Sequence, residues 1–319
     1  MEKKTLFKKA FEILKETVNT FMDNRGLKLS ASLAYYTLFS MAPLLLLVIS
    51  LAGAFFGREA IEGSVFAELN ALVGNEAAAQ IQQIIKNMEL SGSTTLSLVI
   101  GGVSLIIGAT TVFGDIQDSV NKIWSVKAKP EKGWVKLVKD RLLSGSIIIG
   151  LGFLLIVSLV VNGAVSAFDY ILKGWLPDFS VILLTALTAL INFLVLALLF
   201  GVIYKVLPDA KIKWRDVRAG ALFTAALFML GRYLIGIYID KSDVGSPYGE
   251  AGSLIIILIW VYYSAAILYI STSFTKVYAA AKGENIKPAD HAVYVEEKEV
   301  ESDNASVLKD VGPAERIIR

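Results

Sequence analysis

Five polar residues lie within or beside long apolar stretches of this sequence, and their side chains could recognise a polar solute. They are Asn162, Asn192, Arg232, Glu250 and Tyr263. Charged and amide groups are costly in hydrocarbon, so they commonly face the interior of a helix bundle or a water-filled path. We therefore take these five residues as candidates that line a substrate pathway.

Four of the candidates also have another explanation. Arg232 either extends its charge to the membrane interface along its aliphatic stem or faces a wet cavity, and the sequence favours neither. An asparagine inside a span usually bonds to a neighbouring helix, which contributes on the order of 1 kcal/mol. Glu250 is more simply a surface carboxylate, although it could pair with Arg232 if its loop folds inward.

Pro43 lies inside the first apolar stretch. Proline removes a backbone hydrogen bond and bends a helix. A packing kink is the simpler explanation for Pro43, and a gating hinge is the alternative.

The elements that must position these residues are six long apolar stretches, each close to the ~20 residues that a helix needs to cross a bilayer. Hydrophobic residues make up 55% of the 319-residue chain and charged residues only 19%. The stretches are continuously apolar, whereas barrel strands would be short and alternating. The sequence predicts an all-α integral membrane protein with these six spans: Leu33–Phe56, Leu96–Phe113, Ser144–Ala167, Val181–Tyr204, Ala219–Ile239 and Leu254–Ser273.

Basic residues alternate across the segments between the spans. The Lys and Arg counts are 7, 2, 7, 1, 5, 1 and 7, which sum to 30, and the remaining one of the 31 is Arg232. Short loops rich in Lys and Arg stay on the cytoplasmic side of a membrane. The alternation predicts that both termini are cytoplasmic.

The flanking segments set the expected domain boundaries at residues 1–29, 30–281 and 282–319. Thr5–Met22 has apolar residues at helical spacing with lysines between them, so it lies either on anionic headgroups or against the bundle. The external loop Gly57–Thr95 reads as two short amphipathic helices. From Lys282 onward the chain is charged and aperiodic, which predicts a mobile tail.

Several function classes find no support in the residues. The chain has no ATP-binding Gly-x-x-x-x-Gly-Lys-Ser/Thr loop, no nucleophile–base pair and no metal-ligand cluster. Its single histidine, His291, lies in the expected tail. The cytoplasmic lysines are explained by topology and need no nucleic acid. We expect no enzyme activity, no cofactor and no bound metal.

The order of several short motifs resembles that of the YihY/BrkB family. The resemblance covers about residues 29–280 and implies a bacterial inner-membrane protein with six helices. The motifs are Ala34-Tyr-Tyr-Thr-Leu-Phe-Ser-Met-Ala-Pro43, Asn121-Lys-Ile-Trp124, Tyr204-Lys-Val-Leu-Pro208, Trp214 with Gly220-Ala-Leu222, Tyr248-Gly-Glu-Ala-Gly252 and Trp260-Val-Tyr-Tyr263.

One position departs from the family pattern. Members usually carry Gly-Ala-Glu before a Phe-Thr pair, whereas this chain has Ser271-Thr-Ser273 before Phe274-Thr275. If that glutamate couples transport to protons or ions in the family, this chain lacks it. Members have been labelled ribonuclease BN, and the absence of a His/Asp cluster argues against that label.

The sequence thus favours a transporter or exporter of a small polar solute or a lipid-like molecule that is not itself driven by ATP. The alternative is a non-transporting membrane scaffold for envelope assembly. The expected partners are anionic membrane lipids and a small-molecule or lipid substrate, and the oligomeric state stays open.

Overall fold

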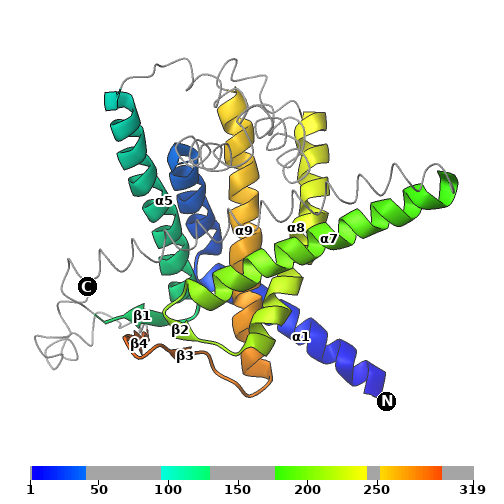
Figure 1. Cartoon of the computed structure of the whole chain (residues 1–319). Coiled ribbons are helices and arrows are strands. Elements are labelled where there is room, and N and C mark those ends of the chain that lie inside the picture. Colours follow the sequence, from blue (N-terminus) through cyan, green and yellow to red (C-terminus); the bar gives the residue numbers. More distant parts are fainter. Residues whose placement is uncertain (1, 41–94, 130–176, 243–251, 297–319) are drawn as a thin grey trace, which may run out of the picture.

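The computed structural model describes residues 2–40, 95–129, 177–242 and 252–296, and this part of the chain is mostly helical (Figure 1). Helix α1 (Glu2–Asp23) ends at a turn in which Arg25 has a φ of 55°. A second helix starts directly after this turn and covers residues 26–40. The turn separates the expected amphipathic segment from the start of the first apolar stretch.

Four long helices follow. They are α5 (Thr95–Ile123), α7 (Pro177–Val206), α8 (Trp214–Ser242) and α9 (Gly252–Ala281). Pro177 suits the first turn of α7, because the amide that proline lacks would have no partner inside the helix there. Helix α9 packs against α1, α5 and α8, and α7 packs against α8.

Among the described residues, three helices are long and apolar enough to cross a membrane, at Ala186–Val206, Trp214–Tyr238 and Leu254–Ala281. They overlap the expected fourth, fifth and sixth spans, which confirms these three as helical and apolar. Helix α5 carries the second expected stretch. The expected third span, the external loop and most of the first span lie outside the described residues.

Four short strands were not expected from the sequence. Strand β1 (Val126–Ala128) pairs antiparallel with β4 (Ala292–Tyr294), and Lys127 lies opposite Val293. Strand β2 (Ala210–Lys211) pairs antiparallel with β3 (Lys287–Pro288). Figure 1 shows the strands gathered near the C-terminal end of α5.

These pairings correct the prediction of a mobile tail from Lys282 onward. Residues 282–296 are ordered because two of their strands complete sheets with the segments that follow α5 and α7. His291, which was expected in the mobile tail, instead lies between β3 and β4 and contacts Asp209. Residues 297–319 lie outside the described part of the chain.

The apolar core lies where α5, α7, α8 and α9 meet. Large side chains with almost no exposed surface come from all four helices or their ends, and three of them are aromatic. The rings of Trp124 and Tyr204 lie 6.5 Å apart. These members of the core are Val120, Ile123, Trp124, Tyr204, Leu207, Val217, Ile257 and Tyr269.

Candidate functional site

A run of hydroxyl side chains is fully buried on α9. Ser271, Thr272, Ser273 and Thr275 each have no exposed surface. Three of them donate hydrogen bonds to the carbonyl four residues earlier, at 2.8 Å for Thr272, 3.0 Å for Ser273 and 2.8 Å for Thr275. A hydroxyl that bonds back to its own helix can be buried in an apolar bundle at low cost.

Tyr204 on α7 brings a phenol to this run. Its hydroxyl donates a hydrogen bond to the Leu268 carbonyl at 3.0 Å and lies 3.0 Å from Thr224 Oγ1 on α8. Three helices are therefore joined through one fully buried hydroxyl. Thr224 in turn donates to the Gly220 carbonyl at 2.7 Å.

Two glycines let α8 approach α9 closely. A Cβ on Gly220 would overlap the Thr275 hydroxyl and would lie 3.1 Å from Thr275 Cβ. A Cβ on Gly231 would lie 2.7 Å from Tyr263 Cζ. Small residues at such positions bring the backbones of membrane helices together. The hydroxyl run therefore has no room for a larger residue on the facing surface of α8.

The C-terminal end of α5 is attached to the same part of α9. The indole Nε1 of Trp124 donates to the Thr272 carbonyl at 3.1 Å. The Lys276 ammonium donates to the Ile123 carbonyl at 2.7 Å and to Ser125 Oγ at 3.0 Å. A lysine there satisfies a terminal carbonyl and opposes the negative end of the helix dipole.

Three polar atoms in this region are buried and have no hydrogen-bond partner in the described part of the chain. They are Asp115 Oδ2, Tyr269 Oη and Ser271 Oγ. The other oxygen of Asp115 accepts a hydrogen bond from Ser32 at 2.8 Å. A buried polar group without a partner costs roughly 1–3 kcal/mol. Unpaired groups of this kind call for an explanation such as a bound water, ion or ligand.

Asp209 joins three segments at the end of α7. Its Oδ2 accepts hydrogen bonds from Asn121 Nδ2 at 2.7 Å and Gln117 Nε2 at 3.1 Å. Its amide donates to Asn121 Oδ1 at 2.9 Å, and its Oδ1 lies 2.8 Å from His291 Nε2. The Ala289 amide donates to its carbonyl at 2.9 Å. Asp209 therefore fastens α5 and the C-terminal strands to α7.

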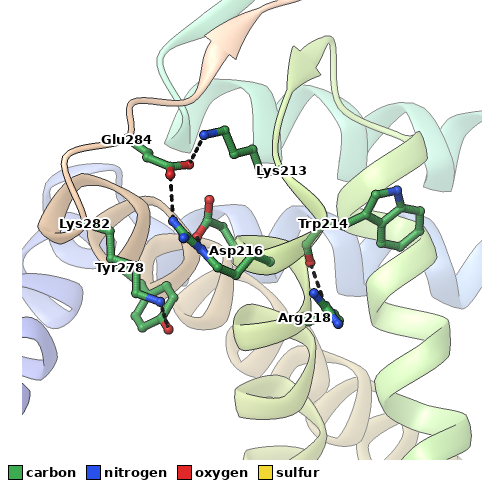
Figure 2. Close-up of polar contacts among 8 residues, drawn as sticks. Lys213, Trp214, Asp216, Arg218, Tyr278, Lys282 and Glu284 are labelled. Atoms are coloured by element: carbon green, nitrogen blue, oxygen red, sulfur yellow. Dashed lines mark hydrogen bonds and ion pairs between the residues drawn. The ribbon is translucent and has the colours of Figure 1, made fainter.

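Ion pairs hold the end of α9 to the start of α8 (Figure 2). Glu284 pairs with Lys213 at 2.9 Å and with Arg215 at 2.7 Å. The hydrogen bond from Lys213 and the charge of Arg215 lower the pKa of Glu284 below its usual value. Trp214 is exposed, and the Lys205 ammonium lies 5.6 Å from its ring centre.

Three of the five predicted pathway residues lie in the described part of the chain. Arg232 is exposed on α8, directly after the glycine that contacts Tyr263, and Tyr263 is half-buried on α9. Asn192 is half-buried on α7. Asn162, Glu250 and Pro43 lie outside the described residues.

Sequence reasoning missed most of the buried polar site. Asp115 was not among the predicted residues; it accepts a hydrogen bond from Ser32, whereas Asp118 and Lys122 on the same helix are exposed. Asp209 carried no signal beyond its position after Pro208. Tyr204 and Trp124 were found only as members of family motifs. In the described residues no group of three or more His, Cys, Asp or Glu side chains could hold a metal.

Comparison with known proteins places the chain in a family. The family model described as virulence factor BrkB matches residues 17–294. A UPF0761 membrane protein of Stenotrophomonas maltophilia (strain R551-3) is 27% identical over 267 residues, which cover 82% of this chain and 59% of that protein. A UPF0761 membrane protein of Vibrio vulnificus (strain CMCP6) is 26% identical over 274 residues, or 82% of this chain and 80% of the relative.

A third relative, from Mannheimia succiniciproducens, is 25% identical over 262 residues that cover 81% of this chain and 86% of that protein. It is also a UPF0761 membrane protein. No solved structure matches the chain. The chain spans about three-fifths of the Stenotrophomonas relative. With the family model matched over most of its length, and with helices apolar enough to cross a bilayer, this chain is a membrane protein of the BrkB family.

Proposed function

We propose that this protein is a transporter or exporter of a small polar solute or a lipid-like molecule. The observation that carries the proposal is a set of three buried polar atoms that have no hydrogen-bond partner among the described residues: Asp115 Oδ2, Tyr269 Oη and Ser271 Oγ. A bundle that served only as a framework would gain stability by replacing such groups with apolar ones. A transporter needs polar groups that are free to bind a passing solute.

The energy source in this proposal is an existing gradient. The sequence has no ATP-binding loop, so transport is passive or coupled to an ion. The predicted pathway residues Arg232, Asn162, Asn192, Tyr263 and Glu250 remain part of the proposal as the outer section of the path. Tyr263 lies against α8 at Gly231, and this contact supports its placement beside Arg232.

We propose six spanning helices in the bacterial inner membrane, with both termini cytoplasmic. The charges around the four strands support this orientation, because basic segments stay on the inner side. An exposed tryptophan beside a lysine is typical of the membrane interface. The basic residues in this part of the chain are Lys122, Lys127, Lys129, Lys205, Lys211, Lys213, Arg215, Arg218, Lys282 and Lys287.

Helix α1 supports anionic lipids as partners. One face packs against α9 and buries Thr17 and Phe21. A second stripe at helical spacing stays exposed, with Phe11 69% and Val18 50% exposed. Lys8 and Lys15 lie beside this stripe on the helical wheel, as in helices that bind the surface of acidic membranes. The packed face of α1 thus supports docking against the bundle, and the exposed face supports contact with anionic headgroups.

A scaffold is the second candidate function, and the strands favour it. Strand β4 exposes Val293 and Tyr294, and Val295, which directly follows the strand, is also exposed. An exposed apolar strand can pair with a strand from another protein. On this alternative the protein binds an envelope partner at its inner end and moves no solute.

Reconstitution of the full chain in vesicles tests the proposal. The assay follows labelled sugars, amino acids, organic anions and fluorescent phospholipids across the bilayer. We expect flux of at least one probe above the rate of protein-free vesicles. Flux of no probe by folded, inserted protein would refute the transporter proposal and favour the scaffold.

Tyr269→Phe is the sharpest variant, because it removes a buried hydroxyl that has no partner in the described residues. Loss of an unpaired hydroxyl leaves stability unchanged or raised. We expect flux to fall about tenfold while the unfolding midpoint is maintained. Arg232→Ala, with Arg232→Lys as the charge-preserving control, tests the outer section of the path, and wild-type flux in Arg232→Ala would remove Arg232 from it.

A further inference from the structure

Asp115 occupies an unusual position on α5. It lies two residues beyond the apolar stretch that ends at Phe113, where the chain is expected to leave the hydrocarbon. Ser32, from the helix of residues 26–40, donates a hydrogen bond to its Oδ1 at 2.8 Å. The Asp115 charge also acts on the Tyr269 phenol of α9. The carboxyl group is thus linked to two segments that are far from it in the sequence.

The described residues give Asp115 few hydrogen bonds for a carboxylate. An ionised carboxylate can accept about four hydrogen bonds. Within the described residues, Oδ1 accepts one from Ser32, and Oδ2 is buried without a donor. A neutral carboxylic acid would carry its proton on an oxygen such as Oδ2 and could donate it to a nearby acceptor.

Tyr269 on α9 is electrostatically linked to Asp115. It has no exposed surface, and its hydroxyl has no hydrogen-bond partner in the described part of the chain. The Asp115 charge acts on this phenol, as do Ser119 and Tyr204. A proton on Asp115 would remove the negative charge that acts on Tyr269.

Burial and a neighbouring charge also favour the protonated form of Asp115. Burial raises the pKa of Asp115 above its usual value, and the negative charge of Asp118 raises it further, while the hydrogen bond from Ser32 partly opposes them. Asp118 lies on the same helix as Asp115, and the Asp115 charge in turn acts on Tyr269 of α9.

We propose that Asp115 is a reversible proton-binding site between α5, α9 and the helix of residues 26–40. The carboxylate takes a proton from water and becomes a carboxylic acid, and no other bond is formed or broken. The coupling role of this proton rests on the proposed transport function, in which the proton is the coupling ion. The binding of the proton itself does not depend on transport.

A proton fits the site better than a metal cation. Ca²⁺ takes six to eight oxygen ligands, and Mg²⁺ requires a near-ideal octahedron. Within the described residues, the side-chain hydroxyl bonded to the Asp115 carboxylate is that of Ser32. This small oxygen set is sufficient for a proton.

Infrared spectroscopy of the full chain in lipid vesicles tests proton binding directly. The carbonyl stretch of a protonated carboxyl group is followed while the pH is lowered from neutral. We expect one carboxyl band to titrate above the range of ordinary aspartates and to disappear in Asp115→Asn. Asp118→Asn is the matched control, since its side chain is exposed one turn further along α5, and it should keep the band.

Absence of the band in the wild type, or its persistence in Asp115→Asn, would overturn the proton site. Tyr269→Phe should shift the titration midpoint of the band, and an unshifted midpoint would overturn the role of the phenol. The titration is repeated in sodium and potassium salts at equal ionic strength. A midpoint that moves with sodium alone would show a cation site in place of a proton site.

Flux measurements separate this inference from the proposed function. With a pH gradient across the vesicle, wild-type flux should depend on the gradient, and Asp115→Asn should lose that dependence. If the infrared band titrates and flux is independent of the gradient, proton coupling is wrong although the proton site is correct. If no probe is transported and the band still titrates, the transporter proposal fails and the proton site stands.

Discussion

Replacing Asn121 with alanine should weaken the attachment of α5 to the end of α7. Asn121 is 5% exposed and makes two hydrogen bonds with one residue. Its Nδ2 donates to the Asp209 carboxylate at 2.7 Å, and its Oδ1 accepts from the Asp209 amide at 2.9 Å. The substitution removes both bonds and leaves a backbone amide without its partner.

The magnitude follows from the two bonds. A hydrogen bond to a charged group contributes about 1.5–3 kcal/mol and a neutral one about 0.5–1.5 kcal/mol. Because such contributions overlap, we expect a loss of about 2–4 kcal/mol in the free energy of unfolding. At about 1.4 kcal/mol per factor of ten, the unfolding equilibrium constant should rise roughly 30- to 700-fold.

The assay is a denaturant titration in mixed micelles, with the helical circular dichroism signal as the readout. Gln117→Ala is the internal control. It removes one longer bond, of 3.1 Å, to the same carboxylate, so its loss should be near the lower end of the range for charged groups, about 1.5 kcal/mol. The double variant Asn121→Ala/Asp209→Ala should lose less than the sum of the two single losses.

Two results would refute this reasoning. An Asn121→Ala midpoint equal to that of the wild type would show that the contact carries no net stability. A Gln117→Ala loss larger than that of Asn121→Ala would show that the geometry around Asp209 differs from the one described.

Two further predictions concern the contacts between α8 and α9. Gly220→Ala should lower the free energy of unfolding by about 1–3 kcal/mol, because its Cβ would overlap Thr275. Gly236→Ala on the same helix is the control: its Cβ meets open space, so it should be neutral or stabilising in the same denaturant titration. Glu284→Gln should destabilise the protein at neutral pH, where the lowered pKa keeps Glu284 charged beside Lys213. The difference in stability between wild type and Glu284→Gln should vanish as the pH falls through the folded-state pKa of Glu284, which lies below the usual glutamate value. Thermal melts in which this difference stays constant with pH would contradict the prediction.

Hydropathy predicted the long helices well, because continuous apolar runs of about twenty residues have few other structures in a membrane protein. It could not predict the strands. Strand β1 is three residues long and pairs with residues more than 160 positions later. Such a short strand has no periodicity of its own, and its partner lies in a charged segment that by composition alone suggests disorder.

The candidate site could be predicted only in part. Arg232 and Tyr263 were visible as polar residues in apolar stretches, but hydropathy does not say which neighbour a side chain meets. Asp115 was not among the candidates, because its contact with Ser32 joins positions 83 apart in the sequence. The roles of Trp124 and Tyr204 likewise depend on partners on other helices.

Position 273 offers a test of whether the buried polar site is closed to water. Ser273 has no exposed surface, and its hydroxyl is satisfied by the Tyr269 carbonyl. Ser273→Glu restores the carboxyl group that the family pattern has there. In a dry site, an ionised carboxylate costs far more than an amide of the same shape.

Lys276 cannot readily offset that charge, because its ammonium is already bound to Ile123 and Ser125 at the end of α5. Ser273→Gln has nearly the same volume and no charge, so it isolates the electrostatic part. We therefore expect Ser273→Glu to be less stable than Ser273→Gln at neutral pH, with the difference shrinking as the glutamate is protonated. Equal stability of the two variants at neutral pH would mean that water reaches position 273, and the hydroxyl run would then line an open path.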